Sequence, residues 1–237
     1  VNSPVYVPFP DLPVRSDPAV FEELSGFDLL EADRFVANGL GEQPFTVVMG
    51  DLGPDTLPDS LKDVGDGIRS DIDGEDGAAN MAREGIDPIG RPVRFAAKKN
   101  AIAMSTSTPL VTDWLGGEAP TLAEDETLVE VAKALDGEDV FSALLTDAMP
   151  MAPDLMATPE SATQQMEALE KATPPVPFDT VGLGWKRGQV VVAYRFAEEP
   201  DTAALEAVWR DGMMFTTQAP ISERLSVASV TAKGNVG

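Results

Sequence analysis

The most regular hydrophobic and polar pattern lies in two stretches, residues 91–115 and residues 181–209. In each stretch, segments rich in apolar residues flank a short polar turn, which is typical of a β-hairpin. The turns contain Asn100 and Gly188, two residue types that tolerate a positive φ. A segment with apolar residues at helical spacing follows each hairpin. Two units of hairpin plus helix in one chain predict an α+β fold.

Several other segments support the same fold class. Residues 45–50 and residues 140–145 are runs of β-branched and apolar residues, which predict two buried strands. Asp125 and Asp201 each precede an amphipathic segment, and we expect each of them to cap the N-terminus of a helix. The proline-rich residues 1–13 predict an extended arm or edge strand.

Five further predictions rest on weaker patterns. Residues 28–39 have apolar side chains at helical spacing and predict a helix, and residues 60–68 predict one or two helical turns. The pair Thr-Pro at the start of residues 158–169 predicts another helix. Residues 225–231 predict a closing strand. Glycine and acidic residues dominate residues 65–90, which therefore predict a long exposed loop and leave open whether it is mobile or ordered.

The order strand, connection, hairpin and helix occurs twice, which predicts an internal duplication. The strand that begins near Phe45 aligns with the one that begins near Phe141. We therefore expect two related halves, residues 1–137 with the N-terminal arm and residues 138–237. Each half is predicted to be a mostly antiparallel sheet with a hairpin covered by helices, as in ferredoxin-like split β-α-β units. The alternative is one continuous domain.

The charge balance of the chain is strongly acidic and limits its partners. The 237 residues include 40 Asp and Glu against 17 Lys and Arg, which gives a net charge of −23. Such a charge repels phosphate backbones and anionic lipids, so nucleic-acid and membrane-surface partners are not expected. No apolar run approaches the roughly 20 residues that cross a bilayer. The chain has no histidine and no cysteine, which excludes disulfides, Ser-His-Asp and Cys-His catalysis, and Cys/His ligand sets.

The densest group of acidic residues is a candidate calcium site. Asp71, Asp73, Glu75 and Asp76 follow one another on a glycine-containing loop, and such carboxylates can supply several of the oxygen ligands that Ca²⁺ takes. The EF-hand pattern is not met, because Asp76 stands where that loop has glycine and Ala82 stands where it has glutamate. The alternative interpretation is a solvated acidic loop that binds no cation.

Two other groups of residues suggest chemistry. Asp51 and Asp147 lie at equivalent ends of the two predicted strands, and a pair of carboxylates can hydrolyse a glycosidic bond. Aromatic residues make up only 6% of the chain, which is low for sugar binding, so turn capping is the alternative role of this pair. Met149, Met151 and Met156 carry thioethers that can bind Cu(I), or they fill a core.

Motifs in the first half resemble those of a family of uncharacterised secreted proteins and lipoproteins of actinobacteria. The motifs are GFD followed by AD in residues 26–33, NG at residues 38–39 and PFTVVMG in residues 44–50. The strand RPVRFA in residues 91–96 is also similar to a following strand of that family. The resemblance implies an exported protein, tethered to the cell envelope by a lipidated cysteine upstream of Val1. It implies no activity and no functional residue.

Taken together, the sequence favours a non-enzymatic extracytoplasmic protein, secreted or in the cell envelope, that binds a ligand or a protein partner. The first alternative is a carboxylate-based, glycosidase-like hydrolase that uses Asp51 and Asp147. The second is a calcium-stabilised adhesion or scaffold module built on the acidic loop. No cofactor other than calcium is expected.

Overall fold

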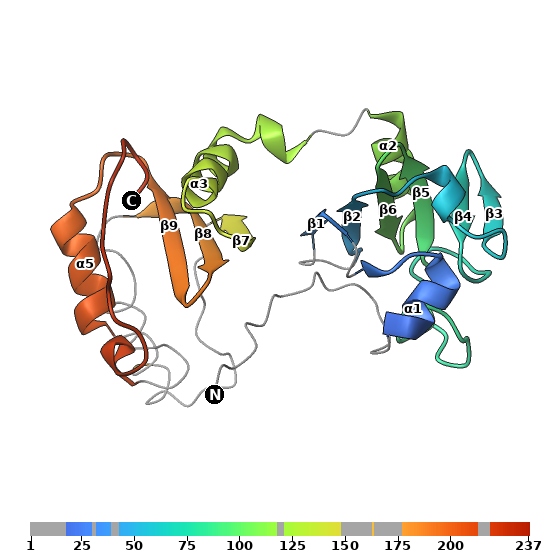
Figure 1. Cartoon of the computed structure of the whole chain (residues 1–237), viewed down its shortest axis with the longest axis horizontal. Coiled ribbons are helices and arrows are strands. Elements are labelled where there is room, and N and C mark those ends of the chain that lie inside the picture. Colours follow the sequence, from blue (N-terminus) through green and yellow to red (C-terminus); the bar gives the residue numbers. More distant parts are fainter. Residues whose placement is uncertain are drawn as a thin grey trace. The chain divides into compact units, whose positions relative to one another are not determined.

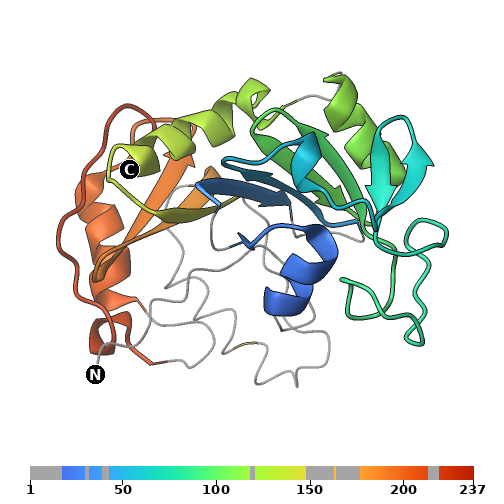
Figure 2. The same ribbon diagram turned by 45° about the vertical axis from the view of Figure 1, so that its right-hand side comes forward.

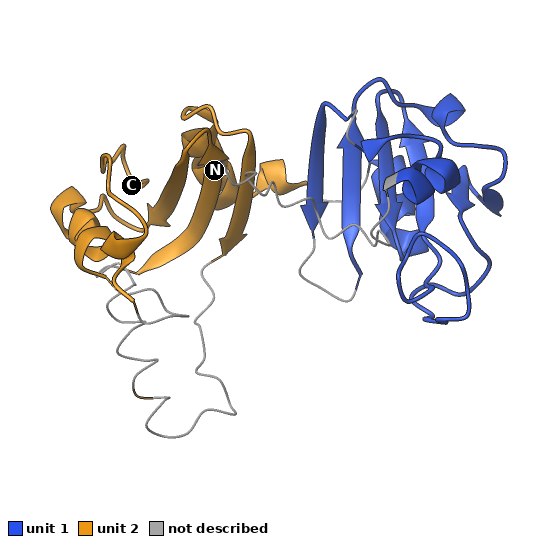
Figure 3. Cartoon of the chain, turned by 60° about the horizontal axis from the view of Figure 1, so that its bottom comes forward, with its two compact units in different colours: residues 1–120 blue, residues 121–237 orange. Residues whose placement is uncertain are grey.

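The computed structural model describes residues 18–29, 32–38, 43–117, 121–147, 163, 177–212 and 219–237. The chain divides into two compact units, Val1–Pro120 and Thr121–Gly237 (Figure 3). Each unit has an antiparallel sheet and helices of its own, so the predicted α+β class is confirmed. Two groups of predictions, the N-terminal arm and the helix of residues 158–169, lie outside the described residues except for residue 163.

Unit 1 is built around a six-stranded sheet with the strand order β1-β2-β6-β5-β4-β3 (Figure 1). The predicted hairpin lies inside this sheet, and its turn residue Asn100 has a φ of 66°, as its residue type suggested. The elements are α1 (Pro18–Ser25), β1 (Arg34–Asn38), β2 (Phe45–Met49), a 3-10 turn (Pro54–Thr56), β3 (Lys62–Gly65), β4 (Ile68–Ser70), β5 (Arg94–Lys98), β6 (Ala101–Ser105) and α2 (Thr108–Gly116).

Both faces of the unit 1 sheet are covered. Side chains alternate along a strand, so the central strands send apolar groups to both faces. Phe95 and Met104 pack with Phe21 of α1 on one face. Ala96 packs with Val111 of α2 on the other face, where its small side chain allows a close approach. Figure 2 shows the same elements from another side.

Unit 2 has a three-stranded sheet with the order β7-β8-β9. The second predicted hairpin is β8 and β9, and its turn residue Gly188 has a φ of 73°. The predicted strand of residues 140–145 is β7, which pairs with β8. The expected burial was wrong, because β7 lies at the edge of the sheet and contains no buried residue. The elements of unit 2 are a 3-10 turn (Leu122–Glu124), α3 (Glu126–Asp136), β7 (Ser142–Asp147), β8 (Phe178–Lys186), β9 (Gln189–Phe196), α5 (Thr202–Asp211) and a second 3-10 turn (Ile221–Glu223).

Helices lie on opposite faces of the unit 2 sheet. On one face, Val131 of α3 sits above Gly182, where an added Cβ would lie 2.5 Å from the Val131 side chain. A glycine is therefore required for α3 to approach β8 this closely. On the other face, Leu205 of α5 packs with Tyr194 and Phe196 of β9. The side chains of Tyr194 and Phe196 thus belong to a second core.

Both predicted N-caps of unit 2 are confirmed. The Asp125 carboxylate accepts hydrogen bonds from the backbone N–H groups of Thr127 and Leu128, at 3.0 and 3.2 Å. The Asp201 carboxylate accepts from the N–H groups of Ala203 and Ala204, at 2.9 and 3.4 Å. These bonds satisfy amide groups that the first turn of a helix leaves without partners.

Three predictions of local structure were wrong. Residues 34–38, expected within a helix, form strand β1, because they pair with β2 over their whole length. Residues 62–65, expected in helical turns, form β3, which pairs with β4. Residues 225–231, expected as a strand, contain no regular element. In the first two cases pairing with a neighbouring strand outweighs the local spacing of apolar residues.

The two units differ in strand order, so the predicted repeat does not extend to topology. Strand β2 lies beside β6, the second strand of the unit 1 hairpin, whereas β7 lies beside β8, the first strand of the unit 2 hairpin. The unit boundary falls before α3, which packs on the strands of unit 2, and not after residue 137. No helix among the described residues is long and apolar enough to cross a membrane.

Candidate functional site

The most elaborate polar structure lies in the loop of residues 71–93, which joins the neighbouring strands β4 and β5. We call it the clamped loop. Its ends are tied together at Asp71, whose backbone N–H donates to the Val93 carbonyl at 3.3 Å. The Asp71 carboxylate accepts from the N–H groups of Val93 and Ile86, both at 2.8 Å. One side chain therefore joins the start, middle and end of the loop.

The environment of Asp71 combines burial with several backbone donors. Burial raises the pKa of this carboxyl group, because a charged carboxylate loses solvation inside the protein. The hydrogen bonds from the backbone of Ile86, Val93 and Ile72 act in the opposite direction and only partly offset the burial. Such an arrangement fixes a loop at the cost of desolvating one acid.

A fully buried carboxylate, Asp87, organises the far part of the clamped loop. Its side chain is fully buried and pairs with the guanidinium of Arg91, with N–O distances of 3.1 and 2.8 Å. The same carboxylate accepts from the backbone N–H groups of Ile89 and Arg91 at 3.0 and 3.1 Å. The buried charge is thus both paired and hydrogen-bonded, as buried charges in proteins usually are.

A buried arginine connects the clamped loop to helix α2. Arg94, on β5, is only 4% exposed. Its guanidinium donates to the Ser70 hydroxyl and to the Gly74 carbonyl, both at 2.6 Å, and to the Asp76 carboxylate at 2.9 Å. The same group also donates to the Thr108 hydroxyl at 3.1 Å. All of these acceptors lie in the loop, in the preceding strand or at the start of α2.

Asp76 completes this connection by capping α2 from outside the helix. It accepts from the Thr108 N–H at 2.6 Å and from the Thr108 hydroxyl at 2.8 Å. Partial burial acts to raise the pKa of Asp76, but the hydrogen bonds from Thr108 and Arg94 outweigh it and leave the pKa below its ordinary value. The Asp76 carboxylate is therefore held in its charged form.

Three of the four acids of the predicted calcium site have separate partners. Asp71 holds backbone amides, Asp76 holds Arg94 and Thr108, and Asp73 forms an ion pair with Lys62. Glu75 is exposed. Within the part of the chain that the structure describes, no three acidic side chains are grouped so that they could hold a metal ion. The loop uses its carboxylates to fix its own shape.

The clamped loop is held by its own side chains and is partly buried. Glycine and acidic residues predicted an exposed loop over residues 65–90, but residues 68–70 form β4 and residues 85–87 are buried, with Asp87 holding the last part. The sequence reasoning did not single out Asp87, Arg91 or Arg94. A signal was present, since Arg94 stands between the apolar residues Val93 and Phe95 in a predicted strand.

The tip of the clamped loop, residues 78–82, is uncharged, and it is exposed from residue 79 to residue 82. Met81 is 77% exposed, the largest exposure among the large hydrophobic residues of the described chain. Asn80 fixes the turn: its N–H donates to the Ile89 carbonyl at 2.9 Å, and its side-chain oxygen accepts from the Ala82 N–H at 3.1 Å. The tip therefore presents an apolar side chain on a defined backbone.

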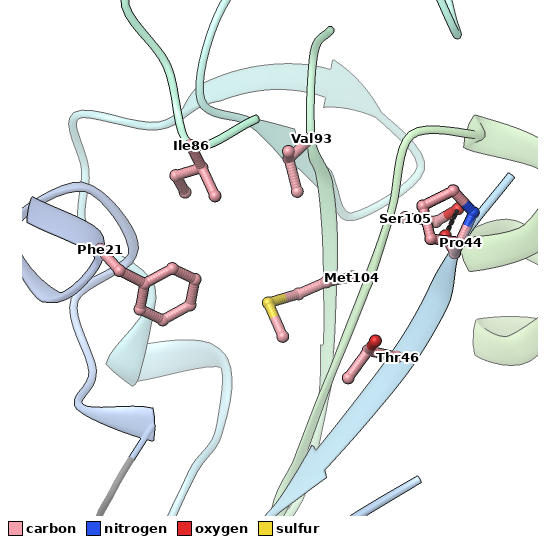
Figure 4. Close-up of a pocket in the computed structure, with 7 residues that line it drawn as sticks. All are labelled: Phe21, Pro44, Thr46, Ile86, Val93, Met104 and Ser105. Carbon is pink, nitrogen blue, oxygen red and sulfur yellow. Dashed lines mark hydrogen bonds between the residues drawn. The ribbon is translucent and has the colours of Figure 1, made fainter. Parts of the chain in front are cut away.

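A small cavity lies in the core of unit 1, near α1 and the strands β2 and β6 (Figure 4). Its volume is about 10 Å³, which is room for roughly one water molecule, whereas small-molecule sites measure several hundred Å³. It is a packing gap of the core and not a ligand pocket. The residues around it are Phe21, Pro44, Thr46, Ile86, Val93, Met104 and Ser105.

The remaining candidate residues are distributed over both units. Asp51 follows β2 in unit 1, and Asp147 ends β7 in unit 2. Both are exposed, and the hydrolase that would pair them stays a prediction. Met149, Met151 and Met156 lie outside the described residues, and with them the Cu(I) hypothesis.

Comparisons of the chain with protein-family models, with curated proteins and with solved structures found no match.

Proposed function

We propose that the protein is a non-enzymatic extracytoplasmic protein of the cell envelope that binds a protein partner through the tip of the clamped loop. One observation carries this proposal. The exposed side chain of Met81 stands on a loop whose base is fixed by Asp71, Asp87 and Arg94. Loops that are held by a rigid scaffold and present exposed side chains are typical of recognition sites.

The fixed base has an energetic consequence for binding. A mobile loop loses conformational entropy when it is ordered against a partner, and this loss weakens the complex. The backbone of residues 71–93 is already tied down before any partner binds, through side chains that contact its own amides. Met81 can then bury its apolar surface at a lower entropic cost, and methionine adapts well to the shape of a pocket.

The surroundings of the tip define the chemistry of the partner. Residues 78–82 carry no charge. Exposed acids lie on both sides of them in the sequence, at Glu75 and Glu84, whereas the one base beside them, Arg83, is half-buried and donates to the Ala78 carbonyl at 3.4 Å. The complementary surface is an apolar pocket with lysine or arginine at its rim, because opposite charges steer association and select the partner. A protein can supply both features in one site.

The location in the cell envelope is part of the proposal. It is supported by the resemblance of the motifs in residues 26–50 to secreted proteins and lipoproteins of actinobacteria. The acidic composition agrees with it, since a high negative charge keeps an exported protein soluble.

The experiment measures binding of the purified chain to cell-envelope fractions of an actinobacterium by sedimentation. We expect saturable binding by the wild type and binding about tenfold weaker for Met81→Glu, because a charge then enters the apolar contact. Val64→Glu is the matched control, since Val64 is also exposed in unit 1 but lies on β3. It should bind as the wild type does.

Digestion of the envelope fraction with a protease before mixing should abolish binding, because the proposed partner is a protein. Three results would overturn the proposal: no saturable binding, equal binding by Met81→Glu and the wild type, or binding that survives the digestion. The melting temperature of each variant shows whether it is folded, so a loss of binding can be separated from a loss of structure.

A further inference from the structure

The sheet of unit 2 has two edges, and the chain treats them differently. The outer edge of β9 is covered by the end of the chain. The backbone N–H of Tyr194 donates to the Gly237 carbonyl at 2.7 Å, and the Tyr194 carbonyl accepts from the Gly237 N–H at 3.0 Å. The backbone N–H of Phe196 donates to the Asn235 carbonyl at 2.8 Å. On the other side, no strand among the described residues pairs with the outer edge of β7.

Strand β7 lacks the features that usually protect an edge strand. Proteins protect edges with short strands, charged side chains, prolines or bulges. Strand β3, an edge of unit 1, is protected in this way by Lys62, Asp63 and a register shift after Asp63. Strand β7 pairs with β8 through six consecutive positions, contains no proline and carries its only charge at its last residue, Asp147. Its backbone is therefore suited to pairing with another strand.

The side chains beside this edge form an apolar row. Leu144 of β7 lies opposite Leu183 of β8, and Leu183 lies opposite Val192 of β9, so all three share one face of the sheet. Leu144 is 52% exposed. Helix α5 covers this face of the sheet at Tyr194. The cluster of side chains around Leu205 of α5 includes no residue of β7. A strand added to β7 could bury its own apolar side chains against this row.

The charges around β7 decide which strand fits. Asp136 and Asp139 precede β7 and Asp147 ends it, and all three are exposed. Together with the net charge of −23, they favour a strand with basic residues at its ends and disfavour a second copy of this chain.

We propose that β7 is a site for strand addition, which binds an extended peptide segment of a partner protein with alternating apolar side chains and lysine or arginine at its ends. In this mode of recognition, backbone hydrogen bonds provide affinity and the side chains on one face provide specificity. The site lies in unit 2 and does not depend on Met81, so it goes beyond the function proposed for the clamped loop.

The experiment uses the full chain and a labelled synthetic peptide in which three Thr-Val pairs stand between two pairs of lysines. Fluorescence anisotropy should show saturable binding. Leu144→Lys should weaken it by about tenfold, because a charge then enters the apolar row and repels the lysines. Leu122→Lys is the matched control, since Leu122 is also an exposed leucine of unit 2 but lies outside the sheet, and it should change little.

Changes in the peptide test the same site without altering the protein. Replacing the central valine by proline should abolish binding, because proline cannot donate to the ladder. Replacing the lysines by glutamates should weaken binding by about tenfold. Hydrogen exchange should show slower exchange of β7 amides, and not of β3 amides, when the lysine peptide is added.

The proposal fails if no saturable binding occurs, or if the proline peptide binds as well as its parent, which would indicate charge attraction alone. It also fails if the chain forms a dimer that Leu144→Lys disrupts, because a second copy would then occupy the edge. Met81→Glu should leave peptide binding unchanged. A result in which Met81→Glu loses envelope binding but keeps peptide binding separates the two proposals.

Discussion

The two units bury polar groups to very different extents. Among the described residues, unit 1 buries the charged side chains of Asp87 and Arg94 together with six hydroxyl-bearing residues, whereas Thr180 is the only buried polar residue of unit 2. The clamped loop accounts for the charged part of this difference, because Asp87 lies in it and Arg94 donates to its Gly74 carbonyl. Unit 2 is held by apolar contacts of α3 and α5 with the sheet.

The contrast shows two ways to specify a structure. Burying a charge pair adds little net stability, because the loss of solvation offsets the attraction, but removing one partner is costly. A polar network therefore makes the shape of a loop definite without making the unit much more stable. Apolar packing stabilises more directly and tolerates changes that conserve volume, but it is weakened by overpacking. We expect unit 1 to be sensitive to loss of charge and unit 2 to be sensitive to changes of volume.

The largest expected effect is that of Asp76→Ala. It leaves the buried Arg94 without its carboxylate and removes the cap of α2, so unit 1 should lose about 3 kcal/mol of unfolding free energy. Urea unfolding followed by Trp114 fluorescence measures it, with Trp185 and Trp209 replaced by phenylalanine so that only unit 1 reports.

Asp73→Ala is the matched control for this variant. Asp73 also forms an ion pair, with Lys62, but its side chain is 84% exposed, so its loss should cost about 0–1 kcal/mol. Equal effects of the two variants would mean that the Arg94 network does not hold the clamped loop.

The second expected effect is a change of volume in unit 2, in contrast to the loss of charge in unit 1. In Gly182→Ala, the new Cβ would lie 2.5 Å from Val131 and 2.8 Å from Leu135, so α3 must move and unit 2 should lose about 2 kcal/mol. The fluorescence of Trp209 reports on unit 2. Gly53→Ala, in unit 1 and followed by Trp114, is the control because nothing lies within 4 Å of its added Cβ. If Gly182→Ala is neutral, the packing of α3 on β8 is looser than the structure shows.

These contrasts also explain which parts of the molecule the sequence could predict. The hairpin turns at Asn100 and Gly188 and the cap at Asp125 depend on residues close in sequence, and local patterns predicted them. Strand β1 was mistaken for a helix, because its apolar spacing fits both structures and only pairing with β2 decides between them. Whether unit 1 and unit 2 derive from one duplicated block stays a prediction.

The clamped loop could not be predicted, because its determinants act over long distances in the chain. Asp71 contacts Val93, and Arg94 contacts Ser70 and Asp76, so each side chain acquires its role only when β4 and β5 pair. Before folding, these residues are indistinguishable from the solvated charges of an acidic surface. Composition therefore predicted an exposed loop, whereas residues 85–87 of it are buried.

A third effect, of intermediate size, concerns the helix caps of unit 2. Asp125→Ala should lower the unfolding free energy of unit 2 by about 1 kcal/mol, since the N–H groups of Thr127 and Leu128 lose their acceptor. Asp125→Asn keeps an oxygen acceptor and should recover most of the loss. An unchanged midpoint of unit 2 unfolding in Asp125→Ala would contradict the cap, and the midpoint of unit 1 should not move in either variant.

The smallest expected effect is the change in the stability of unit 1 with pH that results from titration of Asp76. The pKa of this group is lower in the folded chain than its ordinary value of 3.8, so the folded state favours the charged form. The corresponding stabilisation is fully present above pH 3.8 and is lost as the pH falls through the lower folded pKa. The stability difference between the wild type and Asp76→Asn, measured with Trp114, should therefore shrink on acidification below pH 3.8. A difference that stays constant from neutral to acidic pH would show that the charge of Asp76 contributes nothing, and that its oxygens serve only as hydrogen-bond acceptors for Arg94 and Thr108.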